Sequence, residues 1–387
     1  MLAREFVIVT LPQAGFACTR ERARLGSLEE SAALDNERFS EERVEGKITL
    51  ADVATEAGVS VMTVSRVVNE RPGVGKATRR RVRAAIEALG YRPNIVARGL
   101  KAARSHTLGL LVPDITNPYF PDIVRGAEDV ALAAGYTLLL NNVIEDTGRE
   151  AAALLAFEDR RVDGVIAVSP RLPEARLHEL LRRHVAAVVV NRRAPADIAG
   201  SVRVDHEVGA HLAVRHLLEG GCRMLGLLAG PPDSHAGLER RRGVASELSV
   251  EGMELPDDRV IFGAPTMEGG TRVARELLAR HPDVDGLVCF NDLVAAGAMQ
   301  ALGEAGLRIP ADVAVIGYDD IAYARMFSPA LTTLRVPTYD VGAHAMRMLL
   351  ARMDDRQRDV GIVVQPELVI RASTRPVLAA VPERSPT

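Results

Sequence analysis

The pattern of apolar and polar positions changes near residue 105, and this change predicts two kinds of domain. Between Lys47 and Gly90, apolar residues recur three and four positions apart, as they do in amphipathic helices. After His106, near-continuous apolar runs such as TLGLLVPDI, DGVIAVS and AAVVVNR alternate with helical stretches. Strands of that kind are typical of parallel sheets with helices on both faces. We therefore expect an all-helical unit, then an α/β unit long enough for two sheets.

Three short helices are expected in the first unit. The segment LADVATEA places four apolar residues on one face: Leu50, Val53, Ala54 and Ala57. Gly58 should end this helix, and the Ser60 hydroxyl can cap the first free N–H groups of a second helix, Val61 to Asn69. A third helix is predicted from about Thr78 to Leu89, with Gly90 at its end and with Val82, Ala85, Ile86 and Leu89 facing inward.

Polar residues follow several of the predicted strands in the α/β unit. Examples are Asp114, Asn191, Asn291 and Asp319. Ligands of open α/β sheets bind at the carboxyl ends of the strands. We therefore expect one cleft that is lined by residues from several strands.

Charge separates the two units further. From Lys47 to Arg104 the chain carries 12 Lys and Arg residues and 4 Asp and Glu residues, a net charge of +8, whereas the whole chain has −3. A short basic segment on an acidic body indicates a polyanionic partner for that segment.

The first two predicted helices have the pattern of a helix-turn-helix. Ala54 is small enough for the helices to touch, Gly58 allows the turn, and Val64 can anchor the second helix. That helix would expose Arg66, whose side chain can pair with a guanine edge in the major groove. An ordinary helical hairpin with a solvated basic face is the alternative, and the charge favours DNA.

Other functional classes fit the sequence less well. The three cysteines, Cys18, Cys222 and Cys289, are widely spaced, which argues against a disulfide framework or a zinc site and fits a reducing cytoplasm. No apolar run is long enough to cross a bilayer. We find no phosphate loop, nucleophile elbow or metal-ligand pattern, so we expect no enzyme, no cofactor and no metal. An exported solute-binding protein would lack the basic unit.

At this point the residues resemble a known family. The segments TLADVATEAGVSVMTVSRVVN and ALGYRPNIVARGLK closely match the headpiece of the LacI/GalR repressors. The resemblance continues through TLGLLVPDITNPYF, VCFNDLVAAGAMQAL and VAVIGYDD, and covers all but the first 45 or so residues and the last dozen.

The resemblance implies an α/β core like that of periplasmic binding proteins, with two doubly wound parallel-sheet subdomains, behind a small all-α helix-turn-helix domain. The expected division has five parts. Residues 1–46 form an extension that is disordered or arises from a misassigned start, and 47–92 form the headpiece. Residues 93–104 form a hinge helix, 105–375 the effector-binding and dimerisation core, and 376–387 a flexible tail.

The resemblance also implies a homodimer on a pseudo-palindromic double-stranded operator, with repression as the expected role and activation left open. The short, proline-punctuated tail ASTRPVLAAVPERSPT favours a dimer over the tetramers that the family also forms. In the headpiece the resemblance assigns reading of the major groove to Val61, Met62 and Arg66. The short hydroxyl side chains of Thr49, Ser60, Thr63 and Ser65 suit phosphates, and Leu50 and Asn69 complete the expected DNA contacts. In the hinge the resemblance assigns DNA contacts to Asn94, Ala97, Leu100 and Lys101. Leu100 would wedge into the minor groove and bend the duplex.

A small-molecule effector is implied for the core. By position, its pocket falls on Asp114, Tyr119, Phe120, Asn191, Arg240, Asn291 and Asp319. Aromatic rings can stack on a sugar, and the polar groups can bind hydroxyls, so a sugar or sugar derivative is the expected effector. A purine or nucleoside stays open. So do structural roles: helix capping for Asn291 and Asp319, and packing for Tyr119 and Phe120.

Overall fold

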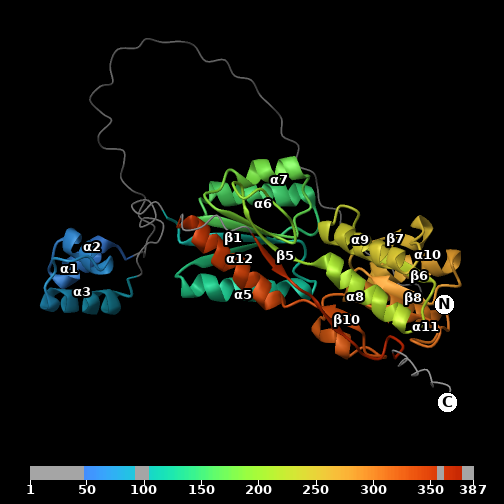
Figure 1. Ribbon diagram of the computed structural model, residues 1–387. Helices are drawn as coiled ribbons and strands as arrows, with labels where there is room; N and C mark the ends of the chain where they lie inside the picture. Colours follow the sequence, from blue (N-terminus) through green and yellow to red (C-terminus); the bar gives the residue numbers. More distant parts are fainter. Residues whose placement is uncertain (1–47, 92–103, 355–360, 377–387) are drawn as a thin grey trace, which may run out of the picture. The chain divides into compact units, whose positions relative to one another are not determined.

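The computed structural model describes residues 48–91, 104–354 and 361–376 (Figure 1). The chain divides into two compact units between Pro93 and Asn94, and each is described by itself. The predicted extension and hinge contacts Asn94, Ala97, Leu100 and Lys101 lie outside the described residues, as does nearly all of the predicted tail.

The first unit consists of α1 (Leu50–Ala57), α2 (Val61–Val68) and α3 (Lys76–Leu89). Ser60 caps α2 as expected, because its Oγ accepts a hydrogen bond from the Thr63 N–H at 3.2 Å. Gly58 and Gly90 end α1 and α3 in the left-handed conformation, with φ of 61° and 62°. The third helix begins two residues before the expected position, because its N-cap is Gly75, which lacks the capping side chain that marks a helix start in a sequence.

The core of the first unit is built mainly from the small side chains of valine and alanine. Val53, Val64 and Val82 are fully buried, one from each helix. They pack with a set of other buried residues, namely Ala54, Ala57, Val67, Ala85 and Tyr91. Residues of this size let three short helices approach closely, so the predicted inward face of each helix is confirmed.

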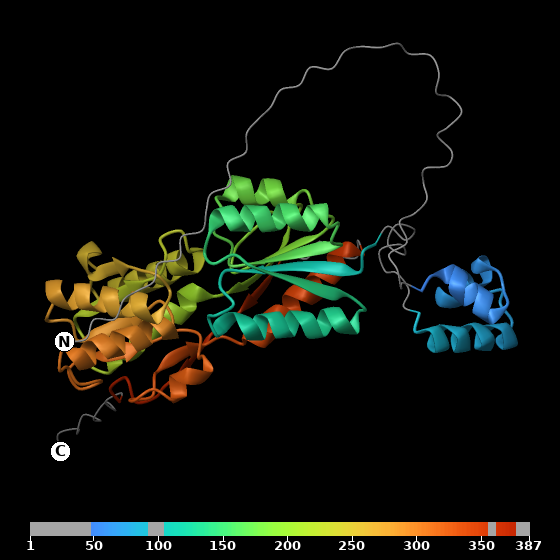
Figure 2. The same cartoon turned by 180° about the vertical axis from the view of Figure 1, so that it is seen from behind.

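The second unit begins with a six-stranded, wholly parallel sheet in the order β11–β5–β4–β3–β1–β2. Its strands are β1 (Thr107–Val112), β2 (Thr137–Asn142), β3 (Gly164–Val168), β4 (Ala187–Val190), β5 (Gly200–Val204) and β11 (Ile362–Val364). Helices α6 (Thr147–Asp159) and α7 (Glu174–Leu181) cover one face, and α5 (Tyr119–Ala133) and α12 (Thr338–Met353) cover the other (Figures 1 and 2).

A second parallel sheet has the order β7–β6–β8–β9. Its strands are β6 (Leu225–Ala229), β7 (Val260–Phe262), β8 (Gly286–Cys289) and β9 (Ala314–Ile316). Helices α8 (His206–Glu219) and α9 (His235–Val250) lie on one face, and α10 (Met267–Arg280) and α11 (Asp292–Glu304) on the other (Figure 2). Two short 3₁₀ helices, Asp257–Arg259 and Ala322–Arg325, complete this subdomain.

The chain crosses between the two sheets three times. The first crossing joins β5 to α8 at Asp205, and the second joins β10 (Thr333–Arg335) to α12. The third joins β11 to β12 (Glu367–Val369), which pairs antiparallel with β10. The Asp205 N–H donates to the Val364 carbonyl at 2.9 Å, so the first and third crossings lie side by side.

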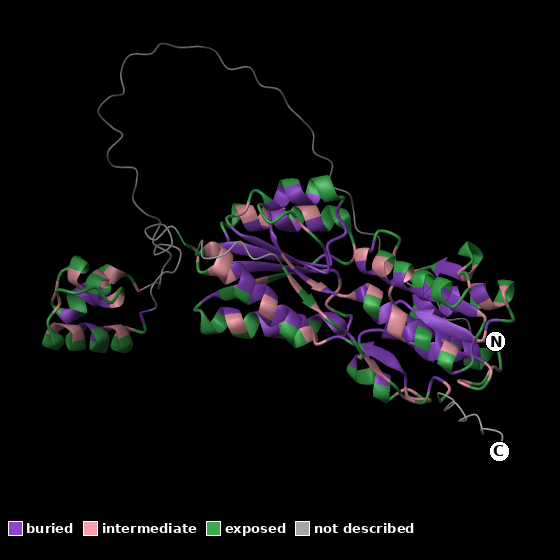
Figure 3. Cartoon of the chain, in the orientation of Figure 1, coloured by how far each residue is buried: buried purple, intermediate pink, exposed green. Residues whose placement is uncertain are grey.

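Burial follows the layers (Figure 3). The central strands β3 and β4 are buried throughout, as the near-continuous apolar runs predict. Helices α5 and α12 meet closely at two glycines: a Cβ on Gly126 would collide with the Tyr339 carbonyl, and one on Gly342 with the Ile123 carbonyl. None of the described helices combines the length and hydrophobicity that crossing a bilayer requires.

Candidate DNA-reading helix and effector cleft

The side chains that were expected to read DNA are exposed to solvent on α2. Met62 is 66% exposed and Val61 46% exposed, and both occupy the first turn of the helix. Arg66 is also exposed, and its guanidinium makes no hydrogen bond or ion pair with another described residue. An arginine in that state can give all of its donors to a nucleic acid without breaking a bond within the protein.

The other predicted contacts of the headpiece have local roles as well. Thr49 and Asp52 form a reciprocal capping box at the start of α1. The hydroxyls of Ser60 and Thr63 lie 2.9 Å apart, and the Asn69 side chain donates to the Ser65 carbonyl at 2.7 Å. Leu50 is partly buried against the headpiece core. These bonds fix both helix ends, which orients the exposed turn of α2.

A cleft in the second unit is lined by both subdomains. The first contributes Asn117, Tyr119, Phe120, Glu145, Ser169, Arg171 and Asn191, and the second contributes Ser234, Ala236, Arg240, Pro265, Phe290, Asn291 and Asp319. Each of these residues follows the carboxyl end of a strand or belongs to the helix after it. The cleft therefore lies where doubly wound sheets bind ligands, as the polar strand ends predict.

Backbone strain gathers at the same place. Ser169, Asn191 and Asp319 have φ of 47°, 59° and 113°, a region that residues other than glycine adopt at a cost. Ser169 and Asn191 directly follow β3 and β4, and Asp319 lies just beyond β9. Strained residues of this kind cluster at binding sites, where the surrounding structure holds them in place.

In the first subdomain, Asn191 organises the cleft wall. Its side-chain amide donates to the Ser169 hydroxyl at 3.0 Å and to the Tyr119 hydroxyl at 3.3 Å. Its Oδ1 is buried and has no partner among the described residues. Burial raises the pKa of Tyr119 to about 12, so its hydroxyl stays protonated. The wall thus offers a free acceptor beside a neutral hydroxyl.

In the second subdomain, Arg240 is the central group. Its guanidinium carbon lies 3.6 Å from the centroid of the Tyr318 ring and 4.9 Å from that of Phe290. It also donates to the Phe290 carbonyl and lies 3.7 Å from the Asp319 carboxylate. Burial raises the pKa of Asp319 well above its ordinary value, and the guanidinium opposes that rise. Arg240 is therefore held in one position by rings and by acceptors.

A second cation in the cleft is also paired. Arg171 donates to the Glu145 carboxylate at 2.7 Å from Nε, and a second nitrogen lies 3.3 Å from the other oxygen. The backbone N–H of Arg171 donates to Glu150, which is almost wholly buried. Each of the two cations in the lining therefore lies beside a carboxyl group, and the contact between Arg171 and Glu145 is bidentate.

The cleft is narrow and partly open to solvent. Its lining surrounds about 380 Å³ of space. The Tyr119 and Phe120 rings meet edge to face, with centroids 5.1 Å apart and planes at 85°. The lining thus combines aromatic rings with hydrogen-bonding groups, which is the combination that a small-molecule site requires.

Six of the seven effector residues expected from the sequence line the cleft. Asp114 does not, because its carboxylate accepts from the Thr116 N–H at 3.0 Å in the turn after β1. Asn291 lines the cleft and also caps α11, where its Oδ1 accepts from the Val294 N–H at 2.8 Å. The capping role weighed for Asn291 is thus present, and its contact with an effector stays a prediction.

The sequence reasoning missed several lining residues, notably Asn117, Ser169, Arg171, Ser234 and Phe290. Ser169 ends the predicted strand DGVIAVS, so the rule that found Asn191 could have found it. Arg171 and Ser234 lie in loops of no regular spacing. Their contribution depends on where each loop turns, which the sequence pattern does not specify.

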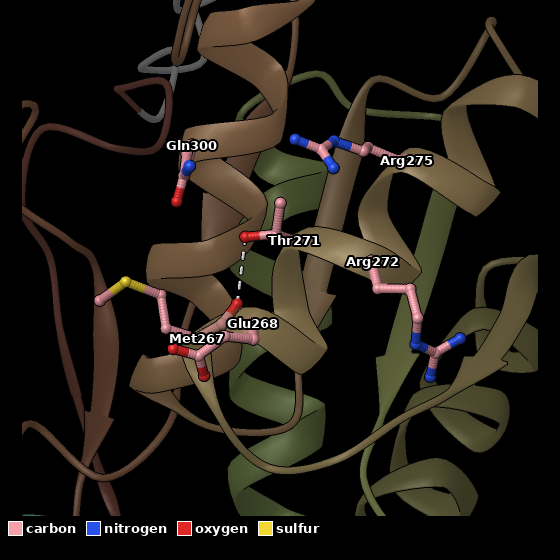
Figure 4. Close-up of a pocket in the computed structure, with 6 residues that line it drawn as sticks. All are labelled: Met267, Glu268, Thr271, Arg272, Arg275 and Gln300. Carbon is pink, nitrogen blue, oxygen red and sulfur yellow. Dashed lines mark hydrogen bonds between the residues drawn. The ribbon is translucent and has the colours of Figure 1, made fainter. Parts of the chain in front are cut away.

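A second opening lies on the outer surface of α10 and α11 (Figure 4). Its lining comes from one subdomain alone: Met267, Glu268, Thr271, Arg272, Arg275 and Gln300. Arg272 and Arg275 are already paired, with Glu276 and Glu304. A ligand there would touch neither the other sheet nor the crossings, so this groove does not have the geometry of an effector site.

An exposed helix-turn-helix and a separate two-sheet unit with a ligand cleft define a DNA-binding regulator with a sensor domain. Comparison with known proteins agrees. Residues 49–94 match the model of bacterial regulatory proteins of the lacI family, and residues 214–374 match a periplasmic binding protein-like domain. The chain belongs to the LacI family, and it is a transcriptional regulator whose DNA binding is controlled by a small molecule.

Relatives align over most of the chain. The ribose operon repressor of Halalkalibacterium halodurans is 38% identical over 84% of this chain and 97% of its own. The transcriptional repressor PurR of Klebsiella pneumoniae is 36% identical over 84% and 96%. A crystal structure of the lac repressor dimer bound to operator and the anti-inducer ONPF has a TM-score of 0.78 and 28% identity, covering 85% of this chain and all of that one.

Proposed function

We propose that this protein is a cytoplasmic repressor that binds a pseudo-palindromic operator as a homodimer and releases or tightens its grip when a neutral sugar enters the cleft. The observation that carries the effector class is charge pairing: Arg171 faces Glu145, and Arg240 faces Asp319. An anionic effector would meet a carboxylate beside each cation. An uncharged polyol would instead share the donors and acceptors that these pairs leave free.

The polar groups of the cleft suit a polyol in number and in kind. The free Oδ1 of Asn191 can accept from a sugar hydroxyl, and the Asn117 and Ser169 side chains can complete pairs of hydrogen bonds. Tyr119, Phe120 and Phe290 offer apolar faces to ring carbons. Ligand sites of this size combine an apolar lining with a few convergent polar groups.

A purine or nucleoside is the second candidate. The similarity to PurR favours it, and the same aromatic side chains could hold a flat base. A base is best held between two parallel rings, however, and Tyr119 and Phe120 stand at 85° to each other. This geometry supports the sugar over the base.

On the DNA side, we propose that Val61, Met62 and Arg66 of each protomer read the major groove of one half-site. The exposure of all three supports this role. Thr49, Leu50, Ser60, Thr63, Ser65 and Asn69 would contact the backbone or orient the helix. The predicted hinge contacts, including the Leu100 wedge, remain part of the proposal.

Several apolar side chains are exposed on the surface of the second unit, and we propose that a second copy of the chain packs against them. Leu132 at the end of α5 is 71% exposed, and Ile144 after the edge strand β2 is 54% exposed. Tyr323 and Met326 are exposed in the second subdomain. A twofold dimer would bury such residues against their own copies, and its symmetry would match a palindromic operator.

The coupling is proposed to run through the relative position of the two subdomains. A ligand that touches Asn191 and Arg240 at once contacts both sheets and favours one arrangement of the three crossings. By linkage, effector and operator must change each other's affinity by the same factor. Inducer and corepressor behaviour both satisfy this relation.

The first experiment is selection of bound duplexes from a random DNA pool by the purified full-length chain at fixed salt. A recovered pseudo-palindrome supports the dimeric repressor. Neutral sugars, sugar phosphates and purines are then titrated against that duplex and against the free protein. Binding of a neutral sugar with a change in operator affinity supports the proposal. Binding of a purine or a phosphate alone contradicts the effector class, and ligand binding without any change in operator affinity contradicts the coupling.

A further inference from the structure

One buried histidine stands behind the cleft. His206 is the first residue of α8 and follows Asp205, where the chain crosses from the first sheet to the second subdomain. Its side chain is fully buried. It does not line the cleft, and no sequence pattern marked it as a functional residue.

The contacts of His206 converge on Arg240. Two guanidinium nitrogens of Arg240, Nε and Nη2, both approach His206 Nδ1 at 3.4 Å. The Tyr318 hydroxyl lies 3.2 Å from the same nitrogen, and the Tyr318 ring stacks under the guanidinium. Arg240 is therefore contacted by His206 and Tyr318, neither of which lines the cleft.

This geometry specifies the state of the imidazole. An arginine has only donors, so the nitrogen that it faces must be an acceptor and carry no proton. The proton of a neutral ring is then on Nε2, which is buried and has no partner among the described residues. Burial, followed by the charges of Arg240 and Arg203, holds the pKa of His206 well below its usual range.

We propose that His206, as a neutral Nε2–H tautomer, is a positioning residue for effector recognition, holding Arg240 in the orientation that binds the ligand. This role rests on the proposed function, in which Arg240 and Asp319 bind the effector. Without the acceptor, the guanidinium keeps Asp319 and the Phe290 carbonyl but loses its third anchor. The guanidinium can then rotate on the Tyr318 ring. Effector binding must fix it in one of several orientations, and this ordering lowers the affinity.

The proposal is tested with two substitutions at one position and a matched control. His206→Leu removes the acceptor, whereas His206→Asn keeps an acceptor oxygen near the place of Nδ1. His216→Leu is the control: His216 is also buried on α8, but its Nε2 lies 2.8 Å from the Thr374 hydroxyl, away from the cleft. The probes are D-ribose, D-xylose, D-glucose, D-galactose and maltose, measured by calorimetry on the full-length chain.

For the sugar that binds wild type best, His206→Leu should raise Kd on the order of tenfold to a hundredfold, the range for losing a hydrogen bond to a charged group. His206→Asn should stay within about threefold of wild type. His216→Leu should leave Kd unchanged even if it lowers Tm. Wild-type affinity in His206→Leu would overturn the proposal, as would an equal loss in His216→Leu.

A ligand-free measurement separates this proposal from the proposed function. In spectra of ¹⁵N-histidine-labelled protein, with His206→Asn used for assignment, His206 should show the Nε2–H tautomer. It should keep it from about pH 5.5 to 8, where an ordinary histidine titrates. The groups that face it are Arg240 from α9, Tyr318 after β9 and Arg203 from β5. An Nδ1–H tautomer or a charged ring overturns the positioning role. If no sugar binds wild type, the proposed function fails, and these spectra still decide the state of His206.

Discussion

The proposed reading turn of α2 and the proposed effector cleft are built on opposite principles. On α2, Met62 and Arg66 project into solvent, and Arg66 has no partner among the described residues. In the cleft, Asn191, Arg240 and Asp319 are buried. Asn191 donates to the Ser169 hydroxyl, and Arg240 donates to the Phe290 carbonyl. A surface that reads DNA must keep its donors free for the duplex, whereas a pocket for a small ligand must hold its groups in place before the ligand arrives.

The two sites also differ in how the chain produces them. The exposed turn of α2 is fixed by caps within three residues in sequence, such as Ser60 with Thr63. The cleft brings together residues as far apart as Asn117 and Asp319. Damage to one site should therefore leave the other working, and the following substitutions test that independence, from the largest expected effect to the smallest.

Val64→Asp should abolish operator binding and leave the cleft intact. Val64 is fully buried in the headpiece, and an unpaired charge there costs more than about 4 kcal/mol, more than a three-helix unit of this size can lose. Fluorescence anisotropy with the selected operator measures DNA binding, and calorimetry with the effector measures ligand binding. Val61→Asp places the same charge on an exposed turn, so the headpiece should remain folded. Operator binding retained by Val64→Asp would contradict the predicted core.

Asp319→Ala should weaken effector binding by about 2–4 kcal/mol, because Arg240 is left buried without its carboxylate. Operator binding without effector should persist. Asp320→Ala is the matched control, since its carboxylate pairs with Arg335 and Arg371 outside the cleft lining. If both variants lost the same effector affinity, the effect would be structural rather than specific to the cleft.

The core should respond to pH through Asp292. Burial raises the pKa of this carboxyl to about 7, above its ordinary value of 3.8. A raised folded pKa means that the folded chain holds a proton that the unfolded chain releases. Stability therefore increases as pH falls through 7 and is lost as pH rises through it. Between about pH 8 and 5 the gain should be roughly 2–3 kcal/mol.

Denaturant unfolding at several pH values measures this gain, and Asp292→Asn should remove it. An asparagine can still accept from the Ile321 N–H, so the local fold is kept. The headpiece transition should be the same in both proteins. Equal pH slopes in wild type and variant would show that Asp292 is ionised throughout this range.

Arg66→Ala should relax sequence preference by about 1–3 kcal/mol, as expected for a base-reading arginine, and leave effector binding unchanged. Arg81→Ala, an exposed arginine on α3, is the control. Because Arg81 is outside the predicted DNA contacts, its substitution should leave the preferred site unaltered. Unchanged base preference in Arg66→Ala would place the reading face elsewhere.

Ser60→Ala should have the smallest effect. Loss of the cap on the Thr63 N–H should cost the headpiece about 1 kcal/mol. Thermal unfolding of the headpiece measures the change. Operator affinity should fall no further than this loss explains, unless the Ser60 hydroxyl also contacts a phosphate. Effector affinity should not change.

The sequence by itself determined the headpiece almost completely. Helical spacing placed Val53, Val64 and Val82 inward, and Ser60, Gly58 and Gly90 marked the helix ends. These features are local: caps and periodicity act over three or four residues, so they can be read without knowing the fold. The exception was the start of α3, where Gly75 carries no side-chain signal.

The sequence also determined which strands end in polar residues, and so marked Asn191, Asn291 and Asp319 as cleft candidates, whereas Arg240, which lies within α9, was assigned by the resemblance alone. Only the tertiary structure decided that Asp114 turns away, that Arg171 enters with Glu145, and that His206 lies behind Arg240. The physical reason is distance along the chain. His206 and Arg240 are 34 residues apart, and their contact depends on how α8 and α9 pack and where the first crossing places Asp205. Those positions result from the whole fold, and no local pattern contains them.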